Sequence, residues 1–338
     1  MRLTMLRRLY ERPGPWASVY LDTSRDTADA ARLIEQRWHA AREILAEAGC
    51  DPLTVHALED AVLDHPARPG RHGLALFATA GEVILRQALH APPATTISAY
   101  EPLPDAMPMV AQLAGEIHYL RVAVAPSGTA IDAAATGRLI PGGGWSPPLT
   151  DLTWRAGAGD PADAVTELAD RTGPELILVA GAPQARPRLV TQLPDRWRER
   201  VVETENAVPV QAMTDCAEAL RRDTLARLHA QLAHDGSAGN GLSEVVSYLS
   251  RGQVDTLLMI DDPSSTERLW IGPDPHQLSD DPEELRSAGA AHPPLVRADA
   301  AMLRALAATD ASILLCDPDE HDLRGGVAAL LRYADARR

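Results

Sequence analysis

Residues 117–152 decide the fold, because they hold two apolar runs followed by the loop Gly137-Arg-Leu-Ile-Pro-Gly-Gly-Gly-Trp-Ser-Pro-Pro-Leu149. The first run, His118 to Ala125, has the composition of a strand, and the second, Thr129 to Ala135, is expected to return as its hairpin partner. Three consecutive glycines and the flanking prolines then predict a loop that is neither helix nor strand. One large aromatic side chain, Trp145, is expected near the tip of this loop.

The glycine run has two interpretations that the residues alone leave open. It is either an exposed connection whose sequence matters little, or a loop that enters a narrow space and brings its backbone amides against a ligand.

Length and composition limit the class of protein. A chain of 338 residues with 45% apolar residues suits two or three folded domains. No run of eighteen apolar residues is present, so neither secretion nor a membrane span is expected. The three cysteines, Cys50, Cys216 and Cys316, are far apart, which favours a reducing cytoplasm and argues against a thiol zinc site.

The chain has a large negative net charge, and its basic residues are all of one type. A formal charge of −15 repels nucleic acid over most of a surface, so any RNA contact has to come from local arginine patches. All 32 basic residues are arginine, and the absence of lysine excludes Walker-type phosphate loops, protein kinases and pyridoxal-phosphate enzymes. The candidate RNA-binding arginines are Arg138, Arg155, Arg186, Arg188, Arg196 and Arg198.

Residues 1–114 are expected to form an α/β domain. A short amphipathic helix from Met1 to about Gly14 precedes a strand from Trp16 to Thr23, and two helices and a β-hairpin over residues 73–88 follow. The domain is expected to end in a proline-rich stretch over residues 91–108.

Residues 115–234 are expected to form a second domain around the glycine-rich loop. Asp160 is a predicted helix cap, and Gly173 is expected to end that helix. The unbroken apolar run Glu175 to Gly181 predicts a buried strand, and an arginine-rich helix should follow to about Arg200.

The third domain is expected to cover residues 241–338, after a linker-like stretch at 235–241. A helix over 242–249 leads to a strand over 254–260, and a last helix is expected around Val327 to Tyr333. Because helices and strands alternate throughout, the predicted fold class is α/β in three domains.

Other motifs are weaker. Gly157 to Ala162 half matches a dinucleotide fingerprint but follows no predicted strand. The acidic segment Cys316 to Asp322 resembles a metal loop, but acidic residues also favour a helix N-terminus. His229 and His234 do not share a helix face. No cofactor and no metal are therefore expected.

The order of these parts resembles the bacterial relatives of the archaeal and eukaryotic class I release factor and of Pelota. The resemblance rests on the helix Gly241 to Gly252 running into the strand Val254 to Ile260, on the closing segment Leu323 to Leu331, on Leu176 to Gly181, and on the glycine loop. It implies a divergent N-terminal domain, a ribonuclease-H-like central domain and an L7Ae-like C-terminal α/β/α sandwich.

The resemblance also implies a function on the ribosome. The loop Gly142-Gly143-Gly144-Trp145 falls where releasing members carry Gly-Gly-Gln, so it would enter the peptidyl-transferase end of the aminoacyl-tRNA site. The implied partners are ribosomal RNA and, through the C-terminal domain, an elongation-factor GTPase. The expected role is to pause or protect ribosomes under stress, as a hibernation factor does.

Two alternatives stay open. The first is a peptidyl-tRNA hydrolase in which the loop residues Gly142 to Trp145 take part in ester hydrolysis. No glutamine lies in the loop, however, and an indole has one donor and no acceptor with which to place a water molecule. The second alternative is a protein-interaction scaffold that does not bind ribosomes.

Overall fold

The computed structural model describes residues 3, 6–67, 69–114, 116–125, 128–140, 144–146, 151–155, 160–204, 210–233, 238–317 and 323–333. For residues 116, 118, 125–155 and 210–212 the description concerns the backbone alone. The chain divides into two compact units. One is built from both ends of the chain, Met1–Ala114 and Ala226–Arg338, and the other is Gly115–Leu225.

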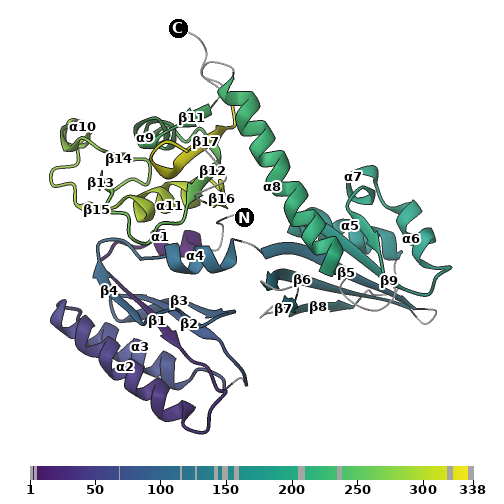
Figure 1. Cartoon of the computed structure of the whole chain (residues 1–338), viewed down its shortest axis with the longest axis horizontal. Helices are drawn as coiled ribbons and strands as arrows, with labels where there is room; N and C mark the ends of the chain where they lie inside the picture. Colours follow the sequence, from purple (N-terminus) through teal and green to yellow (C-terminus); the bar gives the residue numbers. More distant parts are fainter. Residues whose placement is uncertain are drawn as a thin grey trace. The chain divides into compact units, whose positions relative to one another are not determined.

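The first 114 residues form an antiparallel sheet with the strand order β3-β2-β1-β4. Helices α2 and α3 cover one face of this sheet (Figure 1). The strands are β1 (Trp16–Asp22), β2 (Gly73–Thr79), β3 (Glu82–Leu89) and β4 (Ile97–Glu101), and the helices are α1 (Arg7–Tyr10), α2 (Ala30–Glu47), α3 (Pro52–Leu63) and α4 (Met107–Leu113).

Both faces of this sheet are buried, as the alternation of side chains along a strand allows. In β1, Val19 and Leu21 pack with α2 and α3. Trp16 and Tyr20 point to the other face, where they join a core cluster that includes residues of the C-terminal segment. The two ends of the chain therefore share one hydrophobic core, and each end completes the burial of the other.

The C-terminal segment is organised around a second sheet, with the strand order β11-β17-β12-β16. β12 and β16 are parallel and are joined by a crossover that includes α11. The elements are β11 (Ala238–Asn240), α9 (Leu242–Ser250), β12 (Val254–Ile260), β13 (Arg268–Ile271), β14 (Leu278–Ser279), α10 (Pro282–Ser287), β15 (Leu295–Arg297), α11 (Ala298–Ala308), β16 (Ser312–Cys316), η2 (Arg324–Gly326) and β17 (Val327–Leu331). Strands β14, β13 and β15 form a small separate sheet.

The unit Gly115–Leu225 contains a mixed sheet with the order β10-β9-β5-β6-β7, in which β8 also pairs with β6. The strands are β5 (Glu116–Ala125), β6 (Gly128–Ile140), β7 (Gly144–Ser146), β8 (Asp151–Arg155), β9 (Leu176–Gly181) and β10 (Val201–Glu203). The helices are α5 (Pro161–Thr172), α6 (Arg186–Gln192), α7 (Asp195–Arg198) and the first part of α8 (Val210–Leu232).

Helix α5 begins and ends where the sequence predicts. Asp160 accepts a hydrogen bond of 2.9 Å from the backbone N–H of Ala162, which satisfies one of the free donors at the helix start. Gly173 ends the helix in the left-handed region, at φ +59°. The buried strand predicted after it is β9.

The expectation of a mixed α/β protein with several sheets is confirmed, and the division into domains 1–114, 115–234 and 241–338 stays a prediction. Two local predictions are wrong. The segment Val327–Leu331 is the strand β17, not a closing helix, because its five residues are all buried within a sheet. The predicted linker contains β11, which pairs with β17. The proline-rich stretch also contains a strand, β4, which pairs with β1.

Two more differences concern the ends of predicted elements. The first helix is α1, which covers Arg7–Tyr10 alone rather than most of the first fourteen residues. The described part of the glycine-rich loop is extended: β6 continues to Ile140, and Gly144–Ser146 form β7. None of the described helices is both long and apolar enough to cross a lipid bilayer.

Candidate functional site

The glycine-rich turn connects two paired strands. Leu139 of β6 lies opposite Trp145 of β7, and Ile140 lies opposite Gly144, in antiparallel register. Pro141, Gly142 and Gly143 connect these partners in the sequence and lie outside the described residues. The connection between the paired residues Ile140 and Gly144 is short. Short connections between antiparallel strands favour residues that accept positive φ, and glycine accepts it at no steric cost.

The turn lies at one identifiable end of the sheet. Arg138 of β6 is opposite Ser146 on one side and Glu116, the first residue of β5, on the other. The turn is therefore at the end where the parallel strands β5 and β9 begin. The side chains of Arg138 and Trp145 lie outside what the structure describes.

Arg155 lies at the other end of the same sheet. Its partner in β6 is Ala130, eight residues before Arg138, so roughly 27 Å of strand separates the two positions. The start of α6 is at this far end too, because α6 follows the carboxyl end of β9. Arg155, Arg186 and Arg188 are therefore not grouped with the glycine-rich turn.

Arg196 and Arg198 lie at the end where the turn lies, since α7 immediately precedes the first residue of β10, which pairs with Ile177 near the start of β9. Four strand spacings, roughly 19 Å, separate β10 from β7.

Arg196 is held by an aspartate. Its Nε and Nη2 donate to the carboxylate of Asp170 in α5 at 2.9 to 3.2 Å, and the indole Nε1 of Trp197 donates to the same carboxylate at 2.8 Å. The hydrogen bond from Trp197, and after it those from Arg196, lower the pKa of Asp170 below its usual value. The bond from Trp197 has the largest effect. Arg196 nevertheless keeps 58% of its side chain exposed to solvent.

Arg198 closes the end of helix α6. Its guanidinium donates to the carbonyl oxygens of Val190, Thr191 and Leu193, at 3.2, 3.2 and 2.7 Å. The last carbonyl groups of a helix lack partners within the helix, so this side chain acts as a C-terminal cap. Arg200 likewise donates to the carbonyl of Pro174 at 2.7 Å and lies over the ring of Trp197.

The two arginines of α6 differ from each other. Arg186 keeps only 12% of its side chain exposed and donates to the carbonyl of Thr204 at 3.0 Å. Arg188 is exposed and makes no hydrogen bond or ion pair within the part of the chain that the structure describes. Arg188 is thus the one of this pair that can approach a phosphate without giving up an internal contact.

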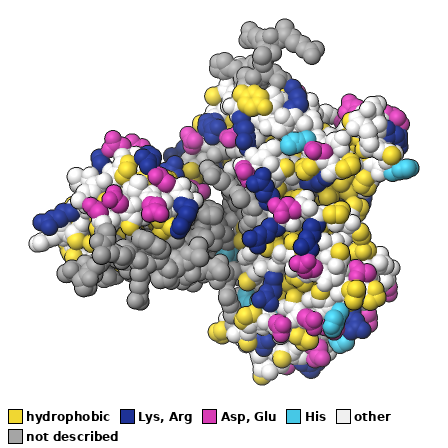
Figure 2. Space-filling view, turned by 180° about the vertical axis from the view of Figure 1, so that it is seen from behind, with side chains coloured by type: hydrophobic (Ala, Val, Ile, Leu, Met, Phe, Trp, Pro, Cys, Tyr) yellow, Lys and Arg dark blue, Asp and Glu magenta, His cyan; other side chains and the backbone are white. Residues whose placement is uncertain are grey.

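On the visible face of the molecule, positive and negative side chains are mixed and form no large patch of one sign. Figure 2 shows arginine and carboxylate side chains interspersed over that face, outside the residues drawn in grey. With a net charge of −15, such a surface gives RNA little general attraction. Any RNA contact on this face would therefore have to come from individually placed arginines.

The family model of the "Bacterial archaeo-eukaryotic release factor family 2" matches residues 141–238. This match begins at the glycine-rich turn and includes α5, β9 and the arginines of α6 and α7. This central segment belongs to that family. The resemblance inferred from the sequence is thereby confirmed for the release-factor segment, residues 141–238.

Individual proteins are similar over longer stretches. An uncharacterized protein of Mycobacterium tuberculosis is 29% identical over 371 residues, which cover 100% of this chain and 98% of that protein. The crystal structure of Archaeoglobus fulgidus Pelota is 11% identical and covers 99% of this chain and 93% of that one, with a TM-score of 0.30. Dom34 of S. cerevisiae, a translation termination-like factor, is 10% identical over 78% of this chain and 80% of its own, with a TM-score of 0.36. The likeness to the release-factor family is thus shown by residues 141–238.

Two of the weaker motifs fall partly outside the described residues. Residues 156–159 of the half fingerprint and residues 318–322 of the acidic segment have no described structure. Sequence reasoning also missed Asp170, which joins Arg196 to Trp197. No motif marks such a residue, since its partners lie 26 and 27 positions away in the sequence.

Proposed function

We propose that this protein is a cytoplasmic, ribosome-associated translation factor that occupies the aminoacyl-tRNA site and pauses or protects ribosomes under stress. In this proposal the glycine-rich turn reaches toward the peptidyl-transferase centre. The C-terminal segment would contact the ribosome or an elongation-factor GTPase. The observation that carries the proposal is the match of the release-factor segment, which begins at the turn itself.

The structure supports a binding role for the turn more than a catalytic one. The residues on either side of the turn are paired strands of a six-stranded sheet, which would present the turn to a target. Trp145 follows the glycines directly, and an aromatic ring stacked on an unpaired base contributes about 1–3 kcal/mol to binding. No glutamine lies between Gly137 and Leu149 to place a hydrolytic water.

Co-sedimentation of the full chain with 70S ribosomes over a range of salt concentrations tests this proposal. Binding should weaken as salt rises, because arginine contacts to phosphates release counterions. Trp145→Ala should weaken binding, whereas Tyr333→Ala, which removes an exposed aromatic ring from the other unit, should not. Absence of binding even at low salt would leave the scaffold alternative.

An assay for the release of labelled peptide from stalled ribosome complexes distinguishes the proposed role from that of a peptidyl-tRNA hydrolase. The proposal expects that the protein binds these complexes and leaves the peptidyl-tRNA ester intact. Rapid peptide release that is abolished by replacing Gly142, Gly143 and Gly144 with alanine would instead favour the peptidyl-tRNA hydrolase.

A further inference from the structure

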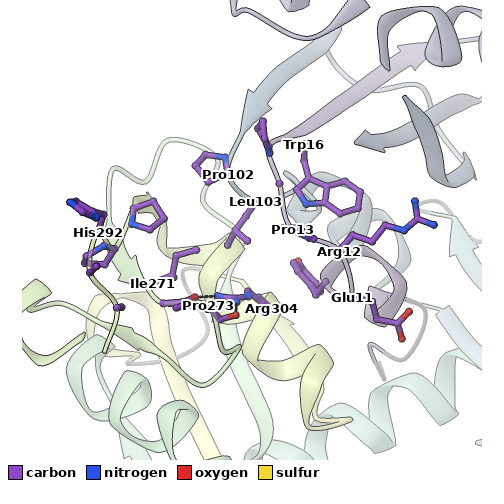
Figure 3. Close-up of a pocket in the computed structure, with 18 of the residues that line it drawn as sticks. Glu11, Arg12, Pro13, Trp16, Pro102, Leu103, Ile271, Pro273, His292 and Arg304 are labelled. Atoms are coloured by element: carbon purple, nitrogen blue, oxygen red, sulfur yellow. Dashed lines mark hydrogen bonds between the residues drawn. The ribbon is translucent and has the colours of Figure 1, made fainter. Parts of the chain in front are cut away.

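One cavity of the unit built from both chain ends, of about 650 Å³, has charges of both signs in its wall. Figure 3 shows Glu11 and Arg12 on the segment that precedes Trp16, and Arg304 on α11. Arg304 is only 8% exposed and donates a 2.9 Å hydrogen bond to the carbonyl oxygen of Gly272. A wall of mixed charge selects neither an anion nor a cation.

A different cavity of the same unit, of about 420 Å³, lies where β12 ends, β17 begins and α11 begins. We refer to this space, between Ile260–Asp262, Ala298–Asp299 and Gly325–Val327, as the β12 groove. Among the described residues, nothing lies within 4 Å of a Cβ placed on Gly325, so the groove is open at that wall.

The floor of the β12 groove is apolar. The half-buried side chains of Leu242 and Ile260 line it. Three methionines, Met107, Met259 and Met302, line it as well and are 3–5% exposed. Methionine side chains are unbranched and flexible, so this floor can readjust to an incoming group.

The rim of the β12 groove carries an excess of negative charge. Its charged residues are Asp261, Asp262, Glu267 and Asp299 against Arg297. The Nε of Arg297 donates to both carboxylate oxygens of Asp299, at 3.1 and 3.2 Å, so the charge of this arginine is already balanced. Within the described chain, Asp261, Asp262 and Glu267 form no ion pair with an arginine. Negative charge without a counter-charge therefore surrounds an apolar opening.

The crowding of these carboxylates affects Asp261. Burial raises the pKa of Asp261, the negative charges of Asp299 and Asp262 raise it further, and Arg297 opposes them. A cation brought to the groove would relieve this repulsion, whereas the phosphates of RNA would add to it. The groove is therefore complementary to a basic protein surface and not to nucleic acid.

We propose that the β12 groove is a docking site for a basic, partly apolar segment of a partner protein. An arginine or lysine of the partner would lie among Asp261, Asp262 and Glu267, and an apolar neighbour would contact Leu242 and Ile260. Arginine and lysine suit this site because their aliphatic stems pack on apolar surface while the charged group stays at the rim. The space is small, so it receives individual side chains rather than a whole helix. This contact goes beyond the proposed role on the ribosome and does not depend on it.

Fluorescence anisotropy of the full chain with a labelled short peptide of alternating leucine and arginine tests the site. A control peptide has citrulline in place of arginine, which keeps the shape of the side chain and removes its charge. The arginine peptide should bind saturably with one site per chain, and the citrulline peptide about tenfold or more weakly. No saturable binding of the arginine peptide would overturn the proposal, and so would equal binding of the two peptides.

Charge-matched variants assign the binding to the groove. Asp262→Lys combined with Glu267→Lys reverses two exposed charges of the rim and should weaken binding of the arginine peptide about tenfold or more. Glu43→Lys combined with Glu47→Lys makes the same change of net charge at exposed positions of α2, outside the groove, and should change binding little. An equal loss in both double variants would mean that net charge alone attracts the peptide, and the proposal would fail.

Two further variants test the apolar floor and the choice of cavity. Leu242→Ala removes apolar surface without changing charge and should weaken peptide binding several-fold. Ala291→Trp fills part of the cavity in Figure 3 and should leave binding unchanged. Loss of binding in Ala291→Trp with full binding in Leu242→Ala would place the peptide in the other cavity. Saturable binding of single-stranded RNA that Leu242→Ala weakens would show that the groove takes nucleic acid. Either result would overturn the proposal.

Discussion

Leu139 and Trp145 are directly opposite each other in the β6–β7 ladder, with Ile140 and Gly144 as the next pair toward the turn. This register fixes the place of the glycine-rich turn at the end of the longest strand of the sheet. Trp145 is the first residue after the glycine run that has a side chain beyond Cα. Glycines between two paired strands, followed directly by an aromatic residue, are the physical basis of the proposed ribosomal role.

Replacement of Trp145 by alanine should weaken binding to 70S ribosomes without changing the fold. The lost stacking contact corresponds to about 1–3 kcal/mol, or a rise in Kd of roughly five-fold to 140-fold. Quantitative co-sedimentation at constant salt measures it, with Tyr333→Ala as the control. Equal affinities of Trp145→Ala and the unaltered protein would mean that the indole does not contact RNA.

Arg188 and Arg198 should respond differently to replacement by alanine. Arg188 is exposed and without an internal partner in the described chain, so Arg188→Ala should lower the salt dependence of ribosome binding and leave the melting temperature unchanged. Arg198 closes α6 through three carbonyl groups, so Arg198→Ala should destabilise the unit by about 1–3 kcal/mol. Thermal melts and salt titrations of the two variants make the comparison, and the reverse pattern would refute this division of roles.

Gly181 and Gly173 form a matched pair for testing the packing of the sheet. Both have positive φ, but a Cβ on Gly181 would lie 2.0 Å from the carbonyl oxygen of Val124, while nothing lies within 4 Å of one on Gly173. Gly173→Ala should therefore cost only about 1 kcal/mol, and Gly181→Ala several times more. Hydrogen exchange of the β5 and β9 amides checks this, since those two strands would have to separate. Similar protection in the two variants would contradict the close approach of β9 to β5.

Asp105 should make stability depend on pH. Burial raises its pKa to about 6, Asp299 and Glu101 raise it too, and Arg297 opposes them. The native state therefore holds this proton more tightly than the unfolded state, so stability is highest below the unfolded pKa of about 4 and falls until pH passes about 6. At pH 7 the accumulated loss is on the order of 2–3 kcal/mol.

Asp105→Asn removes this titration. Denaturant unfolding at several pH values should show that the variant is more stable than the parent at pH 7 and that the difference shrinks toward pH 4. Asp26→Asn, at an exposed position, serves as the control and should give a constant difference. A stability difference for Asp105→Asn that does not change between pH 4 and pH 7 would argue against a shifted carboxyl group.

The parts of the fold that were predicted from sequence are those with strong local signals. The cap at Asp160, the ending at Gly173 and the buried strand β9 each follow from a few adjacent residues. The strand β17 could not be predicted in this way, because Val-Ala-Ala-Leu-Leu suits a helix or a buried strand equally, and pairing with β12 and β11 decides it.

The candidate site shows the same limit. The glycine run and the family resemblance were readable from the sequence. The actual surroundings of the arginines were not, because a guanidinium that caps carbonyl groups and one that faces solvent look alike in a sequence. Arg198 and Arg188 are such a pair, and distant residues such as Asp170 determine which arginines are held. The buried charge of Arg304 is likewise invisible until α11 and the loop at Gly272 are brought together.

A density map of the full chain bound to the 70S ribosome tests the central claim most directly. The account predicts that the turn at Gly142–Gly144, with Trp145, contacts ribosomal RNA at the peptidyl-transferase end of the aminoacyl-tRNA site. A map in which the turn packs against its own sheet, or in which the protein is bound only outside that site, would contradict it.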